Sequence, residues 1–287
     1  MPADAHSRQD AISVSKCGAG ETAAPPIFCV RIRMFDFGIH DYPSGAPVLL
    51  AISAFLAALA RGFSGFGSAL IFVPLASTAI GPQAAAPLLL IIDGVAAAGL
   101  VPDAWRRADR RDAGTMSIGA LAGVPLGAWV LTKSDPLFIR WSVALFGALL
   151  LALLMSGWRY RGRPTASITV AVGGVAGLLS GVAQVGGPPV VAYWLSRAIP
   201  AETVRANIVL YFAITTVITG AAYLAGGLLT KSVVGLALVI GPIYGLGLYA
   251  GSRIFGLARE STFRRICFAL IAAAIMLSLP VFDILKH

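Results

Sequence analysis

Two charged side chains stand beside or inside long apolar stretches of the sequence, where charges are rare. Arg61 precedes a glycine-rich segment, and Asp93 lies well inside an apolar run. A charge in an apolar environment is costly unless it is paired, so such residues commonly bind ligands or carry protons. We predict that Arg61 binds an oxyanion bidentately, and that Asp93 either carries a coupling proton or pairs with Arg61 when no substrate is bound. The structural alternatives are an arginine that reaches the membrane interface and a hydrogen-bonded carboxylate.

Uncharged hydrogen-bond donors complete this set. Ser64 and Ser68 lie in or next to the first glycine-rich segment, Gln184 lies in a second one, and Asn207 lies one turn into the following apolar run. Hydroxyl and amide groups can donate to the oxygens of a sulfonate. Each could instead serve the fold, because a serine can satisfy nearby backbone groups and an amide can cap a helix or join two helices. For Asn207 we favour the joining role.

The composition places the chain in a lipid bilayer. Hydrophobic residues make up 57% and charged residues 12% of the 287 residues, and the mean hydropathy is +0.83. No charged residue lies between Arg61 and Asp93 or between Arg163 and Arg197, and each stretch exceeds the roughly 20 apolar residues that span a bilayer. A soluble globular protein, a disordered chain and a disulfide scaffold are therefore excluded.

The apolar runs predict ten helical segments, at about 46–60, 68–80, 84–101, 114–131, 137–157, 166–180, 188–199, 206–226, 231–250 and 264–281. The first, second, sixth and seventh segments, of about 12 to 15 residues, reach only about 18 to 22 Å, less than the roughly 30 Å of the hydrocarbon core. We therefore predict half-helices, joined in pairs at glycine-rich breaks that run from Arg61 to Gly67 and from Gly181 to Gly187.

The breaks themselves are candidate binding elements. Irregular backbone inside a bilayer survives only where protein buries it or where it lines a cavity. The N-terminus of the half-helix after each break carries unpaired N–H groups and a partial positive charge, which suits an anion. The backbone positions that we expect to contribute are Gly65, Gly67, Gly186, Gly187 and Pro188.

The basic residues predict the orientation of the chain. Apart from the N-terminal tail, one set of connections holds only Lys133, Arg140, Lys231 and Lys286. The other set holds Arg106, Arg107, Arg110, Arg111, Arg159, Arg161, Arg163, Arg197, Arg205, Arg253, Arg259, Arg264 and Arg265. Cytoplasmic connections carry the excess of Lys and Arg, so we place the arginine-rich set in the cytoplasm and both termini outside. This topology accounts for the net charge of +9, and we expect no nucleic-acid partner.

The chain contains an internal repeat. Gly67 and Gly186, 119 positions apart, align the two breaks, and an offset of 124 lays the glycine pair 123/127 on the pair 247/251. Glycines four residues apart at 119/123/127 and 173/177/181 predict that helices pack closely along these two stripes. Each half has one hairpin and three full spans, an odd number of crossings, so the second half enters from the opposite side. The predicted fold class is an all-α polytopic membrane protein with an inverted repeat of two halves, each a re-entrant or broken helix hairpin plus three transmembrane helices.

Three regions follow from this reading. Residues 1–45 form a polar N-terminal tail, residues 46–160 the first transmembrane repeat, and residues 161–287 the second. The segment that begins at Met34 leads directly into the first apolar run, so we expect Met34 to be the native start of translation.

The glycine-rich stretch 62–74, Gly-Phe-Ser-Gly-Phe-Gly-Ser-Ala-Leu-Ile-Phe-Val-Pro, is echoed at 177–189 by Gly-Leu-Leu-Ser-Gly-Val-Ala-Gln-Val-Gly-Gly-Pro-Pro. These motifs resemble the TauE/SafE sulfite exporter family, and the similarity runs from about residue 45 to 282. Members of that family often have three consecutive glycines in each break, whereas Ser68 and Pro188 interrupt such runs here. The resemblance implies a multi-pass carrier of the bacterial inner membrane for sulfite, sulfonates or related organosulfur anions.

The expected function is therefore secondary transport of a small oxyanion by alternating access. The alternatives are an anion channel, a transporter of a non-sulfur small carboxylate, and a scaffold without transport. We expect no enzymatic activity, because the three histidines lie outside the predicted spans and no hydrolase or dinucleotide motif occurs. We expect no cofactor, and the three cysteines have no metal-ligand spacing. The expected partners are the anionic substrate and the lipid bilayer, with a homo-oligomer left open.

Overall fold

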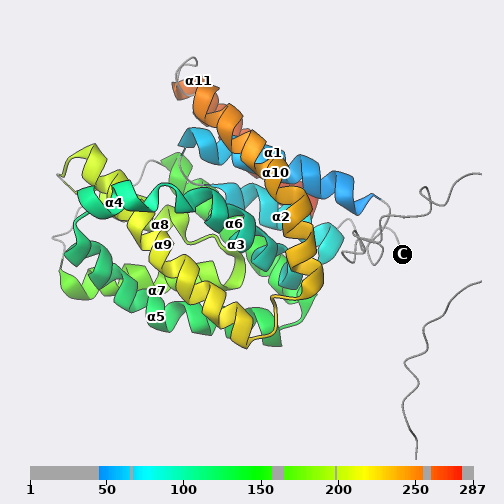
Figure 1. The fold of residues 1–287 in the computed structure, drawn as a ribbon, viewed down its shortest axis with the longest axis horizontal. Helices are drawn as coiled ribbons and strands as arrows, with labels where there is room; N and C mark the ends of the chain where they lie inside the picture. The colour runs from blue at the N-terminus through cyan, green and yellow to red at the C-terminus, as the bar shows by residue number, and fades with distance from the viewer. Residues whose placement is uncertain (1–44, 65–66, 157–164, 198, 255–259, 280–287) are drawn as a thin grey trace, which may run out of the picture. The chain divides into compact units, whose positions relative to one another are not determined.

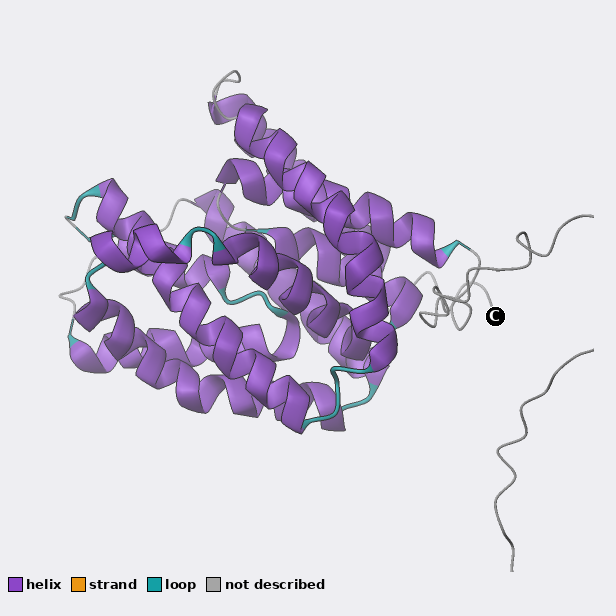
Figure 2. Ribbon diagram, viewed as in Figure 1, coloured by secondary structure: helices purple, strands orange, loops and turns teal. Residues whose placement is uncertain are grey.

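The computed structural model of the chain describes residues 45–64, 67–156, 165–197, 199–254 and 260–279. Within these ranges every regular element is a helix and none is a strand (Figure 2). All of the described residues belong to one compact unit, Phe37–His287. The predicted all-α class is confirmed. The predicted tail up to residue 44 and the expected start at Met34 lie outside the described residues.

The helices follow one another in the chain as shown in Figure 1. They are α1 (Ala46–Ser64), α2 (Ser68–Ile80), α3 (Pro82–Ala98), α4 (Val101–Arg107), α5 (Arg110–Lys133), α6 (Pro136–Ser156), α7 (Ala166–Ala183), α8 (Gly187–Leu195), α9 (Ala201–Ala225), α10 (Lys231–Ile254) and α11 (Glu260–Ser278). Each of the ten predicted segments corresponds to one of these helices, and α4 is the additional one.

The helices before the two breaks are longer than predicted. Helix α1 has 19 residues and continues through Arg61 to Ser64, and α7 has 18 residues and continues through Gly181 to Ala183. The prediction that Arg61 and Gly181 begin the irregular segments was therefore wrong. Because glycine disfavours a helix, we expected α1 and α7 to end before their last glycines. Packing against a neighbouring helix keeps these glycines helical. The intervals between the paired helices are therefore residues 65–67 and 184–186, shorter than the predicted breaks.

Helix α4 was not predicted, because its residues were assigned to the end of one apolar run and to a loop. It follows α3 at a bend of 65°. Its proline lies in the first turn, where a missing N–H costs little, and Asp103 pairs with Arg107 one turn later at 2.9 Å. Asp109 then caps α5 by accepting from the N–H groups of Arg111 and Asp112.

Several helices could cross a bilayer. Among the described residues, five are long and apolar enough, or six if the bent pair α3–α4 is one span. The five are Arg110–Lys133, Pro136–Leu153, Ala166–Ala183, Ala201–Ala225 and Lys231–Arg253, and shorter apolar helices lie at Ala46–Gly62, Ser68–Ile80 and Cys267–Ser278. Large apolar side chains such as Leu145 and Val217 are exposed, as expected of surfaces that face lipid. The chain is a multi-pass membrane protein.

Glycines bring α5 and α7 into close contact (Figure 1). A methyl group added at Gly123 or at Gly127 would come closer than 3.0 Å to the carbonyl oxygens of Gly174 and Leu178, respectively. One added at Gly181 would collide in the same way with the carbonyl oxygen of Val124. Small residues on both helices therefore let the two backbones touch, as their spacing predicted.

The same arrangement joins α1 to α10. A methyl group at Gly62 would collide with the carbonyl oxygen of Leu248, one at Gly251 with that of Leu59, and one at Gly247 would lie 2.6 Å from that of Phe55. Each of these three contacts maps onto one at the α5–α7 interface when α1 is shifted by 119 positions and α10 by 124. The offsets of 119 and 124 therefore align contacts between backbones as well as residue types in the sequence. Each of the two interfaces joins a helix of the first half of the chain to a helix of the second half.

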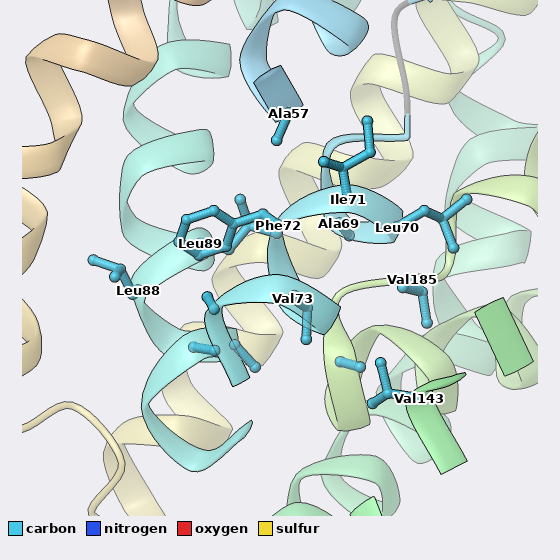
Figure 3. Close-up of a cluster of buried hydrophobic side chains, with 14 of the residues drawn as sticks. Ala57, Ala69, Leu70, Ile71, Phe72, Val73, Leu88, Leu89, Val143 and Val185 are labelled. Atoms are coloured by element: carbon cyan, nitrogen blue, oxygen red, sulfur yellow. The ribbon is translucent and has the colours of Figure 1, made fainter. Parts of the chain in front are cut away.

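The core connects the two breaks. Val185, in the break between α7 and α8, belongs to the same cluster of buried hydrophobic residues as Leu70 and Val73 of α2 (Figure 3). The cluster also includes Ala57 of α1 and Leu89 of α3. The second break therefore packs within the core that surrounds the helix following the first break.

Candidate functional site

Arg61 and Asp93 form an ion pair. Arg61 lies in the last turn of α1, and Nε of its guanidinium is 2.7 Å from Oδ1 of Asp93 on α3. Their side chains are only 16% and 22% exposed. A buried charge needs a partner, and here each of the two charges supplies one. The pairing considered for these two residues on sequence grounds is present in this structure.

A tyrosine from the second half of the chain completes this group. The hydroxyl of Tyr244, on α10, donates to Oδ1 of Asp93 at 2.5 Å, and the Tyr244 side chain is fully buried. The same phenol is hydrogen-bonded to the side chain of Ser68. We call Arg61, Asp93, Tyr244 and Ser68 the polar quartet. Helices α1, α2, α3 and α10 each supply one member, so the quartet draws on both halves.

The quartet lies at the first break. Ser68 is the first residue of α2, and Gly67 before it has a φ of +96°, a left-handed conformation that favours glycine. Ser64 is the last residue of α1, and Gly65 lies outside the described residues. The break therefore places a serine hydroxyl at the start of α2 within the network that holds Arg61.

The second break is built from uncharged groups. Gln184 ends α7 in a left-handed conformation with a φ of 61°, and its Nε2 lies 3.5 Å from the Tyr223 hydroxyl. Tyr223 in turn donates to the carbonyl oxygen of Gly181 at 2.8 Å. Gly186 has no room for a side chain, because a methyl group there would collide with Ser180 and with the backbone of Ala176.

Helix α8 begins directly after this break. Gly187 is its first residue, and Pro188 lies in the first turn, where the missing N–H costs little. Gly187 and Pro188 are buried.

Asn207 lies away from both breaks, near the start of α9. Its Oδ1 accepts from the backbone N–H of Asp109 at 2.8 Å, and the side chain is fully buried. This bond joins α9 to the connection between α4 and α5, which is the role favoured for Asn207 on sequence grounds. Its Nδ2 has no hydrogen-bond partner among the described residues.

Sequence reasoning missed two groups of residues. Tyr244 was not considered, since a tyrosine in an apolar helix carries no distinctive signal. The second group joins α5 to the end of α8: Asp112 accepts from Nε1 of Trp194 at 2.7 Å and is paired with Arg197. Asp112 stands in an arginine-rich connection, so the pattern suggested an exposed charge. Its side chain is in fact only 14% exposed.

The described residues offer no centre for a metal ion. Among them, no group of three or more His, Cys, Asp or Glu side chains is placed to hold one. Two ion pairs among the described residues are mostly buried, Arg61–Asp93 and Arg197–Asp112. The first of them lies at a break, and its guanidinium has donors suited to an oxyanion.

Fold and site together define a class of protein: a polytopic helical membrane protein with a buried ion pair at a broken helix. Comparison with known families makes this specific. The family model described as "Sulfite exporter TauE/SafE" matches residues 50–278, which is most of the chain. The chain belongs to this family, a family of membrane transporters. A search of the curated proteins and a search of the solved structures each gave no match.

Proposed function

We propose that the protein is a secondary transporter that moves a small oxyanion, sulfite or an organosulfonate, across the bacterial inner membrane by alternating access. The family supports transport of sulfite or a related anion. The proposed substrate, membrane and mechanism of transport are argued from the site. The observation that carries the proposal is Arg61, a guanidinium mostly buried at a helix break and held by Asp93 alone among the described carboxylates.

The site is proposed to form around the first break and to close with groups of the second. Arg61 supplies the charge, and the proposed donors are the hydroxyl and backbone groups of Ser64, Gly65, Gly67 and Ser68, between the end of α1 and the start of α2. Gln184, Gly186, Gly187 and Pro188 form the facing wall at the start of α8. Asn207, whose Nδ2 has no partner within the described part of the chain, offers this donor on the path to the cytoplasm. Packing of Val185 in one cluster with Leu70 supports the closeness of the two breaks.

An inverted repeat is proposed as the basis of alternating access. It is supported by the two glycine interfaces, in which α1 packs on α10 and α7 packs on α5 through equivalent contacts. Each hairpin is thus fixed to a helix of the other half. In such a fold the two halves can rock about a central site, exposing it first to one side and then to the other.

Counterflow in proteoliposomes tests the proposal. Vesicles loaded with an unlabelled anion are diluted into labelled anion, for sulfite, isethionate, sulfoacetate, thiosulfate and lactate in turn. A carrier gives transient accumulation of label, whereas a channel gives none. Counterflow with lactate alone would favour the carboxylate alternative, and no counterflow with any anion would overturn transport. Vesicles with the Arg61→Ala variant provide the control for sulfite that crosses lipid as neutral sulfur dioxide.

A further inference from the structure

The quartet has one carboxylate that serves two donors. Oδ1 of Asp93 accepts both from Nε of Arg61, at 2.7 Å, and from the hydroxyl of Tyr244, at 2.5 Å. Without substrate, the guanidinium and the carboxylate balance each other, so the site is neutral. Neutrality matters here because an unbalanced charge at membrane depth is expensive.

Binding of an anion disturbs this balance. If the substrate takes Arg61 and Asp93 remains ionised, two negative charges share one positive charge at a mostly buried site. Like charges in one site disfavour ionisation of the weaker acid, and a carboxylic acid is a weaker acid than the sulfonic acid that corresponds to an organosulfonate. Uptake of one proton by Asp93 makes the site neutral again. The loaded and the empty site then carry the same net charge.

Tyr244 is suited to hold the carboxyl group in both states. A phenol donates to a carboxylate when Asp93 is ionised, and its oxygen can accept from the carboxylic acid when Asp93 is protonated. In the second state the phenol proton can turn to Ser68, its other partner. The side chain of Asp93 therefore stays in place when Arg61 is taken by substrate. This makes Tyr244 a positioning residue.

Asp93 supplies the carboxyl group of the quartet, and we assign the exchangeable proton to it. A guanidinium stays charged in proteins, and an ordinary phenol keeps its proton at neutral pH. Helices α2 and α7, which also pack against α3, contain no titratable side chain. Apart from Asp112, the charged residues at the ends of the other packed helices are exposed, and so is Tyr249 of α10. The remaining titratable side chains of α5, α6 and α9 interact elsewhere: Tyr211 with Gly173, Tyr223 with Gly181, Asp112 with Arg197 and Arg140 with Ser278.

The geometry points to co-transport of the anion with one proton in the same direction. The substrate takes Arg61, the proton takes Asp93, and Tyr244 holds the carboxyl group throughout. Release reverses both steps, because the freed guanidinium draws the carboxylate back and the proton leaves with the anion. This inference rests on the proposed transport function and adds its coupling ion, its stoichiometry and its direction.

An imposed pH gradient tests the coupling. The probe is the anion of the panel above with the fastest counterflow, in vesicles clamped at zero membrane potential. With acid outside, we expect uptake to level off at about a tenfold accumulation per pH unit, as for one proton per anion. A pH-sensitive dye inside should report acidification that starts with uptake.

Two variants locate the proton. Asp93→Asn, which resembles the protonated carboxyl group, should retain counterflow but lose accumulation under a pH gradient. Tyr244→Phe removes a donor to the carboxylate, so its counterflow should reach half-maximum at a higher pH than in the wild type. Tyr223→Phe makes the same change at an equally buried tyrosine of α9, which contacts the second break, and should leave the pH profile unchanged.

The outcomes separate the two proposals. Loss of counterflow for every anion overturns transport and coupling together. Counterflow that is intact but indifferent to the gradient, accumulation only with alkali outside, or a wild-type pH profile in Asp93→Asn each overturns the coupling alone. If Asp93→Asn is poorly folded, the gradient experiment on the wild-type protein still decides.

Discussion

The two breaks share a backbone plan. Helix α1 ends at Ser64 and α7 at Ala183, and α2 begins at Ser68 and α8 at Gly187. Both pairs of positions are 119 residues apart, the offset that aligned the glycine motifs. Each helix before a break also packs through glycines on a helix of the other half. The frame that positions the breaks is therefore repeated closely along the chain.

The chemistry of the breaks is not repeated. Arg61, Asp93 and Tyr244 meet at the first break. With the offset of 119 for the first two and of 124 for the third, the equivalent residues of the other half are Ser180, Phe212 and Ala120. One oxyanion needs one cation, and a second buried arginine would add a cost without a partner. A duplicated frame with a charge in one copy fits a carrier with one substrate site.

The sharpest contrast is expected between Arg61→Ala and Ser180→Ala. The first removes the charged hydrogen bonds to the anion, about 3 kcal/mol or more in total, and should lower flux at least about a hundredfold. The second changes an equivalent but uncharged position and should keep flux within about fivefold, since a single neutral bond is worth about 1 kcal/mol or less. Initial rates of counterflow measure both.

Stability must be separated from binding in this comparison. Arg61→Ala leaves Asp93 without its cation, but the Asp93 side chain is 22% exposed, so expression and insertion should stay near normal. The double variant Arg61→Ala/Asp93→Asn removes the leftover charge. Restored flux in the double variant, or unchanged flux in Arg61→Ala, would remove Arg61 from the binding site.

The repeated frame predicts equal effects at Gly62 and Gly181. An alanine at either position would collide with a backbone carbonyl oxygen of the facing helix, so each should destabilise the fold by about 1–3 kcal/mol. Gly245→Ala is the control, because nothing lies within 4 Å of a methyl group there and alanine favours the helix. Melting in detergent measures all three. A large effect at only one of the two interfaces would contradict the repeat.

Much of this frame could be predicted from the sequence, because its causes are local. Apolar runs placed ten helices, and the glycine spacing predicted close packing of backbones. The ends of α1 and α7 were placed too early, since the glycines in their last turns are stabilised by contacts with α10 and α5. Helix α4 was not predicted, because a short and charged sequence is typical of a loop.

The site was less predictable than the frame. Arg61 and Asp93 stood out because charges are rare in apolar runs. Tyr244 and the group around Asp112 did not, because their roles depend on residues far away in the chain: Tyr244 is 151 positions from Asp93, and Trp194 is 82 positions from Asp112. Periodicity and composition carry no information on such long-range pairs of residues. The internal repeat only limits the number of helix pairs that can be in contact.

Two equivalent glycines, Gly67 and Gly186, should be needed for different reasons. Gly67 adopts a left-handed φ with open space around it, so Gly67→Ala costs about 1–2 kcal/mol of backbone strain, whereas Gly67→Asn, which tolerates this conformation, costs less. Gly186 has an ordinary φ but no space for a side chain, so its replacement by alanine or by asparagine should destabilise the fold to a similar extent. The comparison of the two asparagine variants by melting in detergent is decisive. A milder effect of asparagine than of alanine at Gly186 would contradict the steric explanation.

The smallest effect is expected at Gln184, whose equivalent in the first break is Gly65. Gln184→Gly relieves a left-handed backbone, which favours stability by about 1 kcal/mol, and loses only a weak contact with Tyr223 at 3.5 Å. The melting temperature should therefore rise slightly. If the amide donates to the anion, flux should fall about fivefold, as for one hydrogen bond of about 1 kcal/mol.

These two readouts of Gln184→Gly move in opposite directions, so together they separate a binding role from a structural one. Gln184→Asn keeps an amide and tolerates the left-handed backbone, and it should recover part of the flux. A rise in stability with unchanged flux would mean that the second break contributes its backbone but not its side chain. The second break would then resemble the first more closely, and the role of Gln184 would be limited to ending α7.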